Sequence, residues 1–178
     1  MNFVIIGAGR VGLRTARVLR EEGHEVTLVE PNSERVDRAR ELTFDVVVGD
    51  GSRESVLREA GIADADALGA LTGDLNANFA ACLVAKHHGC RTVMRIDEDY
   101  REEIYQQYAD EVDAVVYPER LGAIGAKNAL LGGSIQAIAD VAQSLQVLLI
   151  TVTDGSPMKG YTLSEVALPS NARILAFG

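Results

Sequence analysis

The sequence predicts an α/β fold built on a doubly wound, parallel sheet of six strands. Three observations carry this prediction. Short apolar runs alternate with amphipathic segments along residues 2–119, the connections between them are short, and the first connection holds three glycines. Because a strand followed by a helix and a short loop returns the chain to the same edge of a sheet, this alternation implies parallel strands with helices on both faces.

The first two strand–helix pairs are predicted by their apolar spacing. NFVIIGA at 2–8 is continuous and apolar, which is typical of a buried parallel strand. The segment VGLRTARVLREEG then has helical spacing and ends in a glycine, a common C-terminal stop. HEVTLVE at 24–30 is the second strand, and a helix over 32–43 follows, for which Asn32 or Ser33 is a suitable N-cap.

The later pairs follow the same logic. DVVVGD at 45–50 is the third strand, and the third helix, 52–61, is opened by Ser52 and closed by a glycine. DALGALTG at 66–73 is the fourth strand, followed by a helix with a small-residue face at 76–89. The remaining elements are a fifth strand at 92–97, a fifth helix at 101–110 and a sixth strand at 114–119.

The regular alternation of predicted strands and helices ends after Pro118. ERLGAIGAKNALL at 119–131 predicts a helix of low charge, and SIQAIADVAQSLQ at 134–146 predicts another. A strand, a turn at DGSP, a short helix and a strand at 173–177 follow. We therefore expect a domain over 1–118, linker helices over 119–143 and a partial α+β unit over 144–178. Two strands and one short helix bury little apolar area, so we expect this unit to be truncated or completed by a partner chain.

Composition limits the class of protein. No apolar run approaches the roughly 20 residues that span a bilayer, and the N-terminus shows no basic region with a cleavage site, so we expect a cytoplasmic protein. Two cysteines suit a reducing compartment. The net charge of −9 argues against a nucleic-acid partner, because no basic surface is available to displace counterions.

The glycine motif GAGRVG follows a strand, opens a helix and has an acidic residue, Glu30, at the end of the second strand. This context is the fingerprint of a Rossmann-type nucleotide site. Gly7 permits the tight turn, Gly9 lets the backbone approach a pyrophosphate, and Gly12 lets the helix pack closely on the sheet. The N–H groups at the helix N-terminus attract an anion. Glu30 is placed to hydrogen-bond ribose hydroxyls and to repel a 2′-phosphate, which disfavours NADP.

Further polar residues fall at the carboxyl ends of strands, where ligands bind in such sheets. Arg10 is either a phosphate clamp or a solvent-facing arginine. Asp50 ends the third strand and is placed to meet the adenine edge, and Thr72 with Gly73 ends the fourth. Arg95 lies within the fifth strand, where a charge needs a partner, either a bound phosphate or a structural salt bridge.

The candidate catalytic and metal-binding residues of this sequence lie at positions that do not suit either role. Hydride transfer needs an acid or base beside the nicotinamide, but His24 sits at a helix–strand turn and His87 with His88 closes a helix. We therefore expect no enzyme, and keep a small NAD-dependent oxidoreductase as the alternative. Cys82 and Cys90 lie near these histidines, but their spacing on a helix end does not converge like a zinc motif, so we expect no metal.

Four segments together resemble one family. GAGRVG, VVVGDGSRESVLREAGIADADAL, ALTGDLNAN and RTVMRI with VVYPE are similar to the regulatory subunits of potassium transporters and channels, the Trk-type or KTN/RCK family with its TrkA N-terminal domain. The matches cover nearly all of 1–120, and the middle segment is the most specific. The tail from residue 147 resembles the opening half of the small C-terminal domain of that family.

The resemblance implies a cytosolic nucleotide-sensing regulatory subunit of a potassium uptake system or channel. It implies NAD or NADH, or alternatively ATP, ADP or AMP, as ligand. It also implies a homodimer and higher oligomers, a tetramer or an octameric ring, at the inner face of the membrane beneath a transporter or channel subunit. The helix at 119–131 would be the crossover that exchanges with a neighbouring subunit. The nucleotide contacts would be Gly7, Ala8, Gly9, Arg10, Val11, Gly12, Glu30, Asp50, Gly51, Ser52, Thr72, Gly73 and Arg95.

Overall fold

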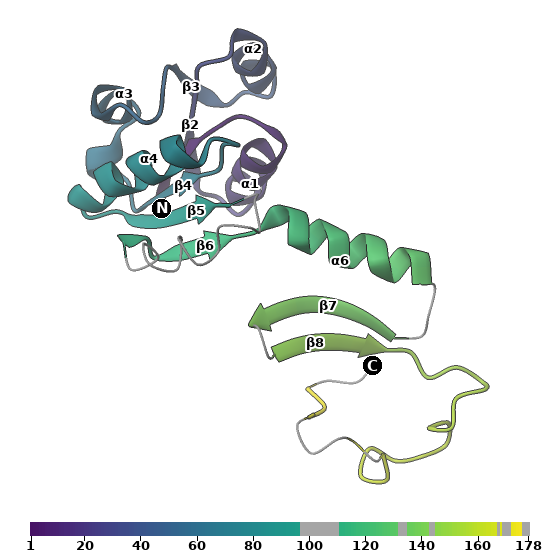
Figure 1. Cartoon of the computed structure of the whole chain (residues 1–178). Helices are drawn as coiled ribbons and strands as arrows, with labels where there is room; N and C mark the ends of the chain where they lie inside the picture. The colour runs from purple at the N-terminus through teal and green to yellow at the C-terminus, as the bar shows by residue number, and fades with distance from the viewer. Residues whose placement is uncertain (97–110, 132–134, 143–144, 167, 169–171, 176–178) are drawn as a thin grey trace. The chain divides into compact units, whose positions relative to one another are not determined.

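A computed structural model divides the chain into two compact units, Met1–Glu119 and Arg120–Gly178 (Figure 1). The structure describes residues 1–96, 111–131, 135–142, 145–166, 168 and 172–175. The fifth helix predicted at 101–110 lies outside these residues. No helix of the described ranges combines the length and the apolar character that crossing a membrane requires.

The first unit is the parallel sheet that the sequence predicts. Its six strands lie in the order β3-β2-β1-β4-β5-β6 and every neighbouring pair is parallel, which confirms the doubly wound α/β fold. The strands are β1 (Asn2–Ile6), β2 (Glu25–Glu30), β3 (Asp45–Val48), β4 (Ala67–Ala70), β5 (Arg91–Arg95) and β6 (Ala114–Val116). The described helices of this unit are α1 (Arg10–Glu21), α2 (Ser33–Glu41), α3 (Glu54–Glu59), the 3₁₀ turn Ile62–Asp64 and α4 (Leu75–His87).

Two apolar cores lie on the two faces of this sheet. Alternate residues of β1 divide between them, since Ile5 packs with residues of α1 and α2, whereas Val4 and Ile6 pack with residues of α3 and α4. Both faces of the strand are buried, which explains why its sequence is a continuous apolar run rather than an alternating one. The two cores hold β1 at the centre of the sheet.

The order of the strands reverses beside β1, which lies between β2 and β4. In such sheets the connections leave this point in opposite directions and open a crevice at the carboxyl ends of the central strands. Gly7 makes the turn after β1 with φ of +93°, a conformation that side chains rarely adopt. A Cβ on Gly7 would lie 2.9 Å from Cγ2 of Thr72, so the ends of β1 and β4 pack directly against one another.

The starts of two helices test the predicted caps. Asn32 caps α2, because its side chain accepts a hydrogen bond from the N–H of Arg35 at 3.1 Å. Ser52 does not open α3, which begins at Glu54. The Asp50 carboxylate instead accepts hydrogen bonds from the Ser52 N–H at 2.9 Å and the Ser52 hydroxyl at 2.7 Å. The serine is therefore held in a turn before the helix starts.

The second unit differs from the sequence prediction. Helix α6 (Pro118–Leu131) is present, and β8 (Leu145–Ile150) contains the strand predicted after residue 146. Strand β7 (Ile135–Ala142) pairs antiparallel with β8 where a second helix was predicted over 134–146, so that helix prediction was wrong. The segment IQAIADVA is rich in β-branched residues and fits both periods, and the apolar segment LQVLLI supplies a partner strand.

The other residues of the second unit that the structure describes form turns and irregular segments. Residues 151–166 contain neither a helix nor a strand, so the short helix predicted there is wrong. Its place is taken by a turn in which the N–H of Glu165 donates to the carbonyl of Thr162 at 3.0 Å. Of the strand predicted at 173–177, residues 173–175 are described and belong to no strand.

The packing of α1 on the sheet generates a stability prediction. A Cβ on Gly12 would lie 1.9 Å from the carbonyl oxygen of Gly7, so Gly12→Ala forces the helix away from the turn. We expect it to lower the free energy of unfolding by about 3 kcal/mol, as measured by urea denaturation. Gly9→Ala is the matched control, because nothing lies within 4 Å of its Cβ position, and its cost should stay below about 1 kcal/mol. Equal losses in the two variants would contradict this packing.

Candidate nucleotide-binding site

The N-terminus of α1 carries no side-chain cap. Its N-cap residue is Gly9, and its first turn contains no acidic residue. The other two helices of nine or more residues described in the first unit are capped, α2 by Asn32 and α4 by Asp74, which accepts from the N–H groups of Asn76 and Ala77. The first N–H groups of a helix need partners and carry partial positive charge. Helix α1 therefore offers its amides to an anion from outside the chain.

The three glycines of the turn have different reasons to be glycine. Gly7 needs its positive φ, and Gly12 is pressed against the carbonyl of Gly7. Gly9 has an ordinary negative φ and would place a Cβ in open space. No packing within the described residues therefore requires glycine at position 9. A ligand that approaches the backbone there does require it, and this is the fit expected of a nucleotide pyrophosphate.

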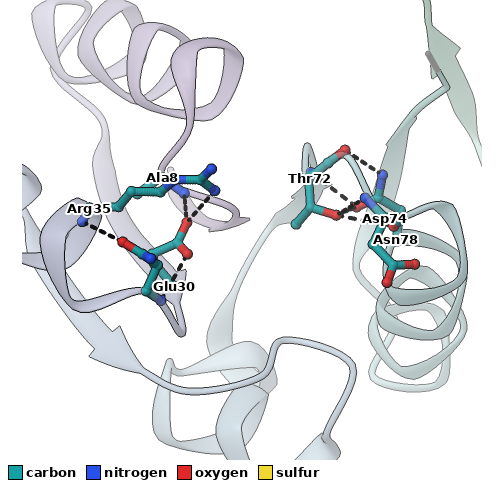
Figure 2. Close-up of polar contacts among 7 residues, drawn as sticks. Ala8, Glu30, Arg35, Thr72, Asp74 and Asn78 are labelled. Carbon is teal, nitrogen blue, oxygen red and sulfur yellow. Dashed lines mark hydrogen bonds and ion pairs between the residues drawn. The ribbon is translucent and has the colours of Figure 1, made fainter.

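Glu30 is held beside this turn by backbone amides (Figure 2). Its residue is 2% exposed, and Oε2 accepts from the N–H of Ala8 at 2.7 Å while Oε1 accepts from the N–H of Asn32 at 3.0 Å. A guanidinium nitrogen of Arg35 lies 3.7 Å from Oε2. A buried carboxylate requires such partners. The predicted acidic residue is thus fixed at the end of β2, where it is hydrogen-bonded to Ala8 of the glycine turn.

A second polar cluster lies at the ends of β4 and β5 (Figure 2). Asn78 of α4 is 1% exposed; its Oδ1 accepts from the N–H and hydroxyl of Thr72 at 3.0 and 2.7 Å. Its Nδ2 donates to the carbonyls of Thr72 and Arg95 at 3.0 and 3.1 Å. Asn78 therefore ties the two strand ends together. The sequence analysis missed it, and the available signal was an asparagine among small apolar residues in NANFAAC.

Arg95 has a structural partner. One of its guanidinium nitrogens donates to Oε1 of Glu119 at 2.7 Å, and its side chain is 17% exposed. This ion pair is one of the two alternatives that the sequence left open. Because Glu119 stands in the first turn of α6, the pair joins the end of β5 to the start of that helix.

The other predicted residues surround the same edge. Asp50 is exposed after β3, and the hydrogen bond from the Ser52 hydroxyl lowers the pKa of its carboxyl below the ordinary value. Gly51 is buried against Ile6 of β1. The exposed positions are Arg10 and Gly73, whereas Val11 is partly buried against the core under α1. The structure thus brings the glycine turn, Glu30 and Thr72 together, and places Arg10, Asp50 and Gly73 at their solvent side.

The three histidines lie at the opposite edge of the sheet. His24 precedes β2 and packs edge-on against Phe3 with ring centroids 5.3 Å apart. His87 ends α4 and His88 follows it, ahead of β5, with Nε2 of His88 3.4 Å from a carboxylate oxygen of Glu54. These positions adjoin the amino ends of strands, whereas the glycine turn follows a carboxyl end.

The two cysteines are buried and free. Burial raises the pKa of the Cys82 thiol to about 12. The Cys90 thiol donates to the carbonyls of Ile62 and Ala65 at 3.2 and 3.1 Å. Protonated thiols with such partners are poor metal ligands. In the part of the chain that the structure describes, no three His, Cys, Asp or Glu residues gather as a metal site would require.

Comparison with known proteins gives a consistent family. The TrkA-N domain matches residues 3–118. The Trk system potassium uptake protein TrkA homolog of Pyrococcus abyssi is 32% identical over 182 residues, covering 99% of this chain and 80% of that protein.

Two solved structures share the fold. The RCK domain of GsuK is 27% identical with a TM-score of 0.61, covering 76% of this chain and 30% of that one. The GsuK channel bound to NAD is 21% identical with a TM-score of 0.54, covering 65% of this chain and 21% of that one. The domain match spans the strands, the glycine turn and both polar clusters described above. The chain therefore belongs to the TrkA-N domain family.

Proposed function

We propose that this chain is a nucleotide-sensing regulatory subunit of a potassium uptake system or channel. The observation that carries the proposal is the glycine turn, in which Gly9 faces open space at an uncapped helix N-terminus. The buried Glu30 carboxylate stands beside it, placed for ribose hydroxyls. Similarity to Trk system potassium uptake proteins supports the potassium role.

The proposed ligand is NAD or NADH, with ATP, ADP or AMP as the alternative. GsuK, whose RCK domain is similar to this chain, is a channel that has been solved bound to NAD. The chain's own residues would bind the ligand in three parts. The α1 amides meet phosphate, Glu30 meets ribose, and the polar end of β4 at Thr72 lines the far side.

We propose that the chain senses the nucleotide and does not transform it. Hydride transfer needs an acid or base beside the nicotinamide. The three histidines stand at the amino edge of the sheet, away from the glycine turn. A small NAD-dependent oxidoreductase remains the alternative that the titration below separates from a sensor.

The proposed setting is the cytoplasm, at the inner face of the membrane beneath a transporter or channel subunit. The proposed assembly is a homodimer that builds a tetramer or an octameric ring. Helix α6 supports this assembly, because its exposed Gly122, Ala123, Gly125, Ala126 and Ala129 let a second helix approach closely.

The Arg95–Glu119 pair offers a route from the site to α6. A nucleotide phosphate that attracts the Arg95 guanidinium competes with Glu119, and the start of α6 then loses its tie to β5. Only nucleotides that differ in affinity for the two arrangements shift their populations.

Isothermal titration with NAD⁺, NADH, ADP and ATP tests the proposed ligand. We expect binding by the unmodified chain and at least a tenfold loss in Gly9→Ala, because its methyl group occupies the space that the pyrophosphate needs, a loss of about 1.4 kcal/mol. Urea denaturation of Gly9→Ala confirms that the fold is retained. Oxidation of NADH when a small carbonyl compound is supplied as hydride acceptor would favour the oxidoreductase, and absence of all binding would refute the proposal.

Glu30→Gln tests the ribose contact. The substitution keeps the shape of the side chain but removes its charge and one acceptor oxygen. We expect NADH affinity to fall about tenfold and the preference for NADH over NADPH to shrink, because the repulsion of a 2′-phosphate is lost. Direct titration of both dinucleotides measures the ratio. A ratio equal to that of the unmodified chain would remove Glu30 from the ribose site.

Small-angle scattering tests the switch. We expect the radius of gyration of the oligomer to differ between at least two of the nucleotides NAD⁺, NADH, ADP and ATP, because they bind the two arrangements unequally. Glu119→Gln is the companion variant and should reduce that difference, since it weakens the tie between β5 and α6. Identical scattering in all four nucleotides would refute switching while leaving nucleotide binding intact.

A further inference from the structure

The Arg35 guanidinium is a third group beside the Glu30 carboxylate, in addition to the two backbone amides that donate to it. Nη1 of Arg35 lies 3.7 Å from Oε2, the same oxygen that accepts from the N–H of Ala8 at 2.7 Å (Figure 2). The distance to Arg35 is longer than a hydrogen bond, so the contact is one of charge. The Arg35 side chain is 59% exposed, in contrast to the carboxylate beside it, which is 3% exposed.

The backbone of Arg35 is fixed although its side chain is open to solvent. Arg35 stands in the first turn of α2, and its N–H donates to the side chain of the N-cap Asn32 at 3.1 Å. The N–H of Asn32 in turn donates to Oε1 of Glu30 at 3.0 Å. The Arg35 side chain therefore extends from a fixed backbone position, which the Glu30 carboxylate helps to hold through Asn32.

Counting acceptor positions shows what a ribose would meet. A carboxylate offers about two acceptor positions on each oxygen. The amides of Ala8 and Asn32 take one on each, which leaves one on Oε1 and one on Oε2. A ribose 2′,3′-diol that engages both oxygens needs both remaining positions, and Nη1 of Arg35 lies 3.7 Å from Oε2. The Arg35 side chain is 59% exposed and its guanidinium lies beyond hydrogen-bond distance, so this contact is weak and gives way to a ribose hydroxyl at little cost.

We infer that Arg35 is a specificity-determining residue that sets how the site responds to the group at the ribose 2′ position. This inference rests on the proposed function, since it requires a ribose at Glu30. Glu30 alone repels a 2′-phosphate. The Arg35 guanidinium, displaced from Oε2 but still anchored beside it, compensates that charge and offers paired N–H donors to phosphate oxygens. The chain therefore discriminates against 2′-phosphorylated nucleotides less strongly than an unpaired glutamate would.

The test compares two arginines of the same helix. Arg35→Ala removes the guanidinium beside Glu30, and Arg38→Ala removes the same charge from an exposed position on α2 that forms no ion pair with Glu30 among the described residues. Dissociation constants are measured by titration for NADH against NADPH, and for ADP against its 2′-phosphorylated form. Arg35→Lys is the third variant, because it keeps the charge and loses the planar fork.

We expect Arg35→Ala to raise the NADPH-to-NADH ratio of dissociation constants about tenfold, because it removes a positive charge beside a dianion in solvent-like surroundings. Arg38→Ala should leave the ratio within about twofold, as distant charges are screened. Arg35→Lys should fall between the unmodified chain and Arg35→Ala.

The role of Arg35 is overturned if Arg35→Ala and Arg38→Ala change the NADPH-to-NADH ratio of dissociation constants equally, or if Arg35→Ala lowers this ratio. The proposed function stands in either case. If the unmodified chain binds neither NADH nor ADP, the proposed function is overturned and this inference with it. The two failures are therefore separated by the unmodified chain alone.

Discussion

The close approach of α1 to the turn after β1 is the constraint on which this edge of the molecule depends. Because position 12 has no side chain, the helix packs against the carbonyl of Gly7, and its first amides have no side-chain cap. The same turn presents the N–H of Ala8 to the Glu30 carboxylate. One backbone conformation thus sets the anion-binding amides and the position of the acidic group at once.

The first unit could be predicted from sequence because its signals are local. Buried parallel strands appear as continuous apolar runs, and the glycines at 7 and 12 announce a turn and a helix–turn contact that the structure contains. Strand β7 was predicted as a helix for a physical reason. A short segment with both periods takes the structure that its partner allows, and that partner lies beyond the segment itself.

The site was predictable in part for the same reason. Glu30 ends β2 and Thr72 follows β4, so the topology places them without further information. Asn78 and Arg35 could not be found in this way. The amide of Asn78 reaches the carbonyl of Arg95, 17 residues away, and Arg35 becomes relevant only because the fold brings its guanidinium to 3.7 Å from the Glu30 carboxylate. Interactions across elements carry no periodic signature in a single sequence.

The two buried thiols have a practical consequence. Alkylating reagents and thiol-directed spin labels are attacked by the thiolate, and burial keeps Cys82 and Cys90 inside the core of the first unit. We therefore expect the native thiols to react little with thiol-directed labels, so introduced cysteines can be labelled selectively. Two cysteines, one introduced at an exposed position of α1 and one at an exposed position of α6, would carry the probes, and the distance between them would report on the two units with Cys82 and Cys90 left in place.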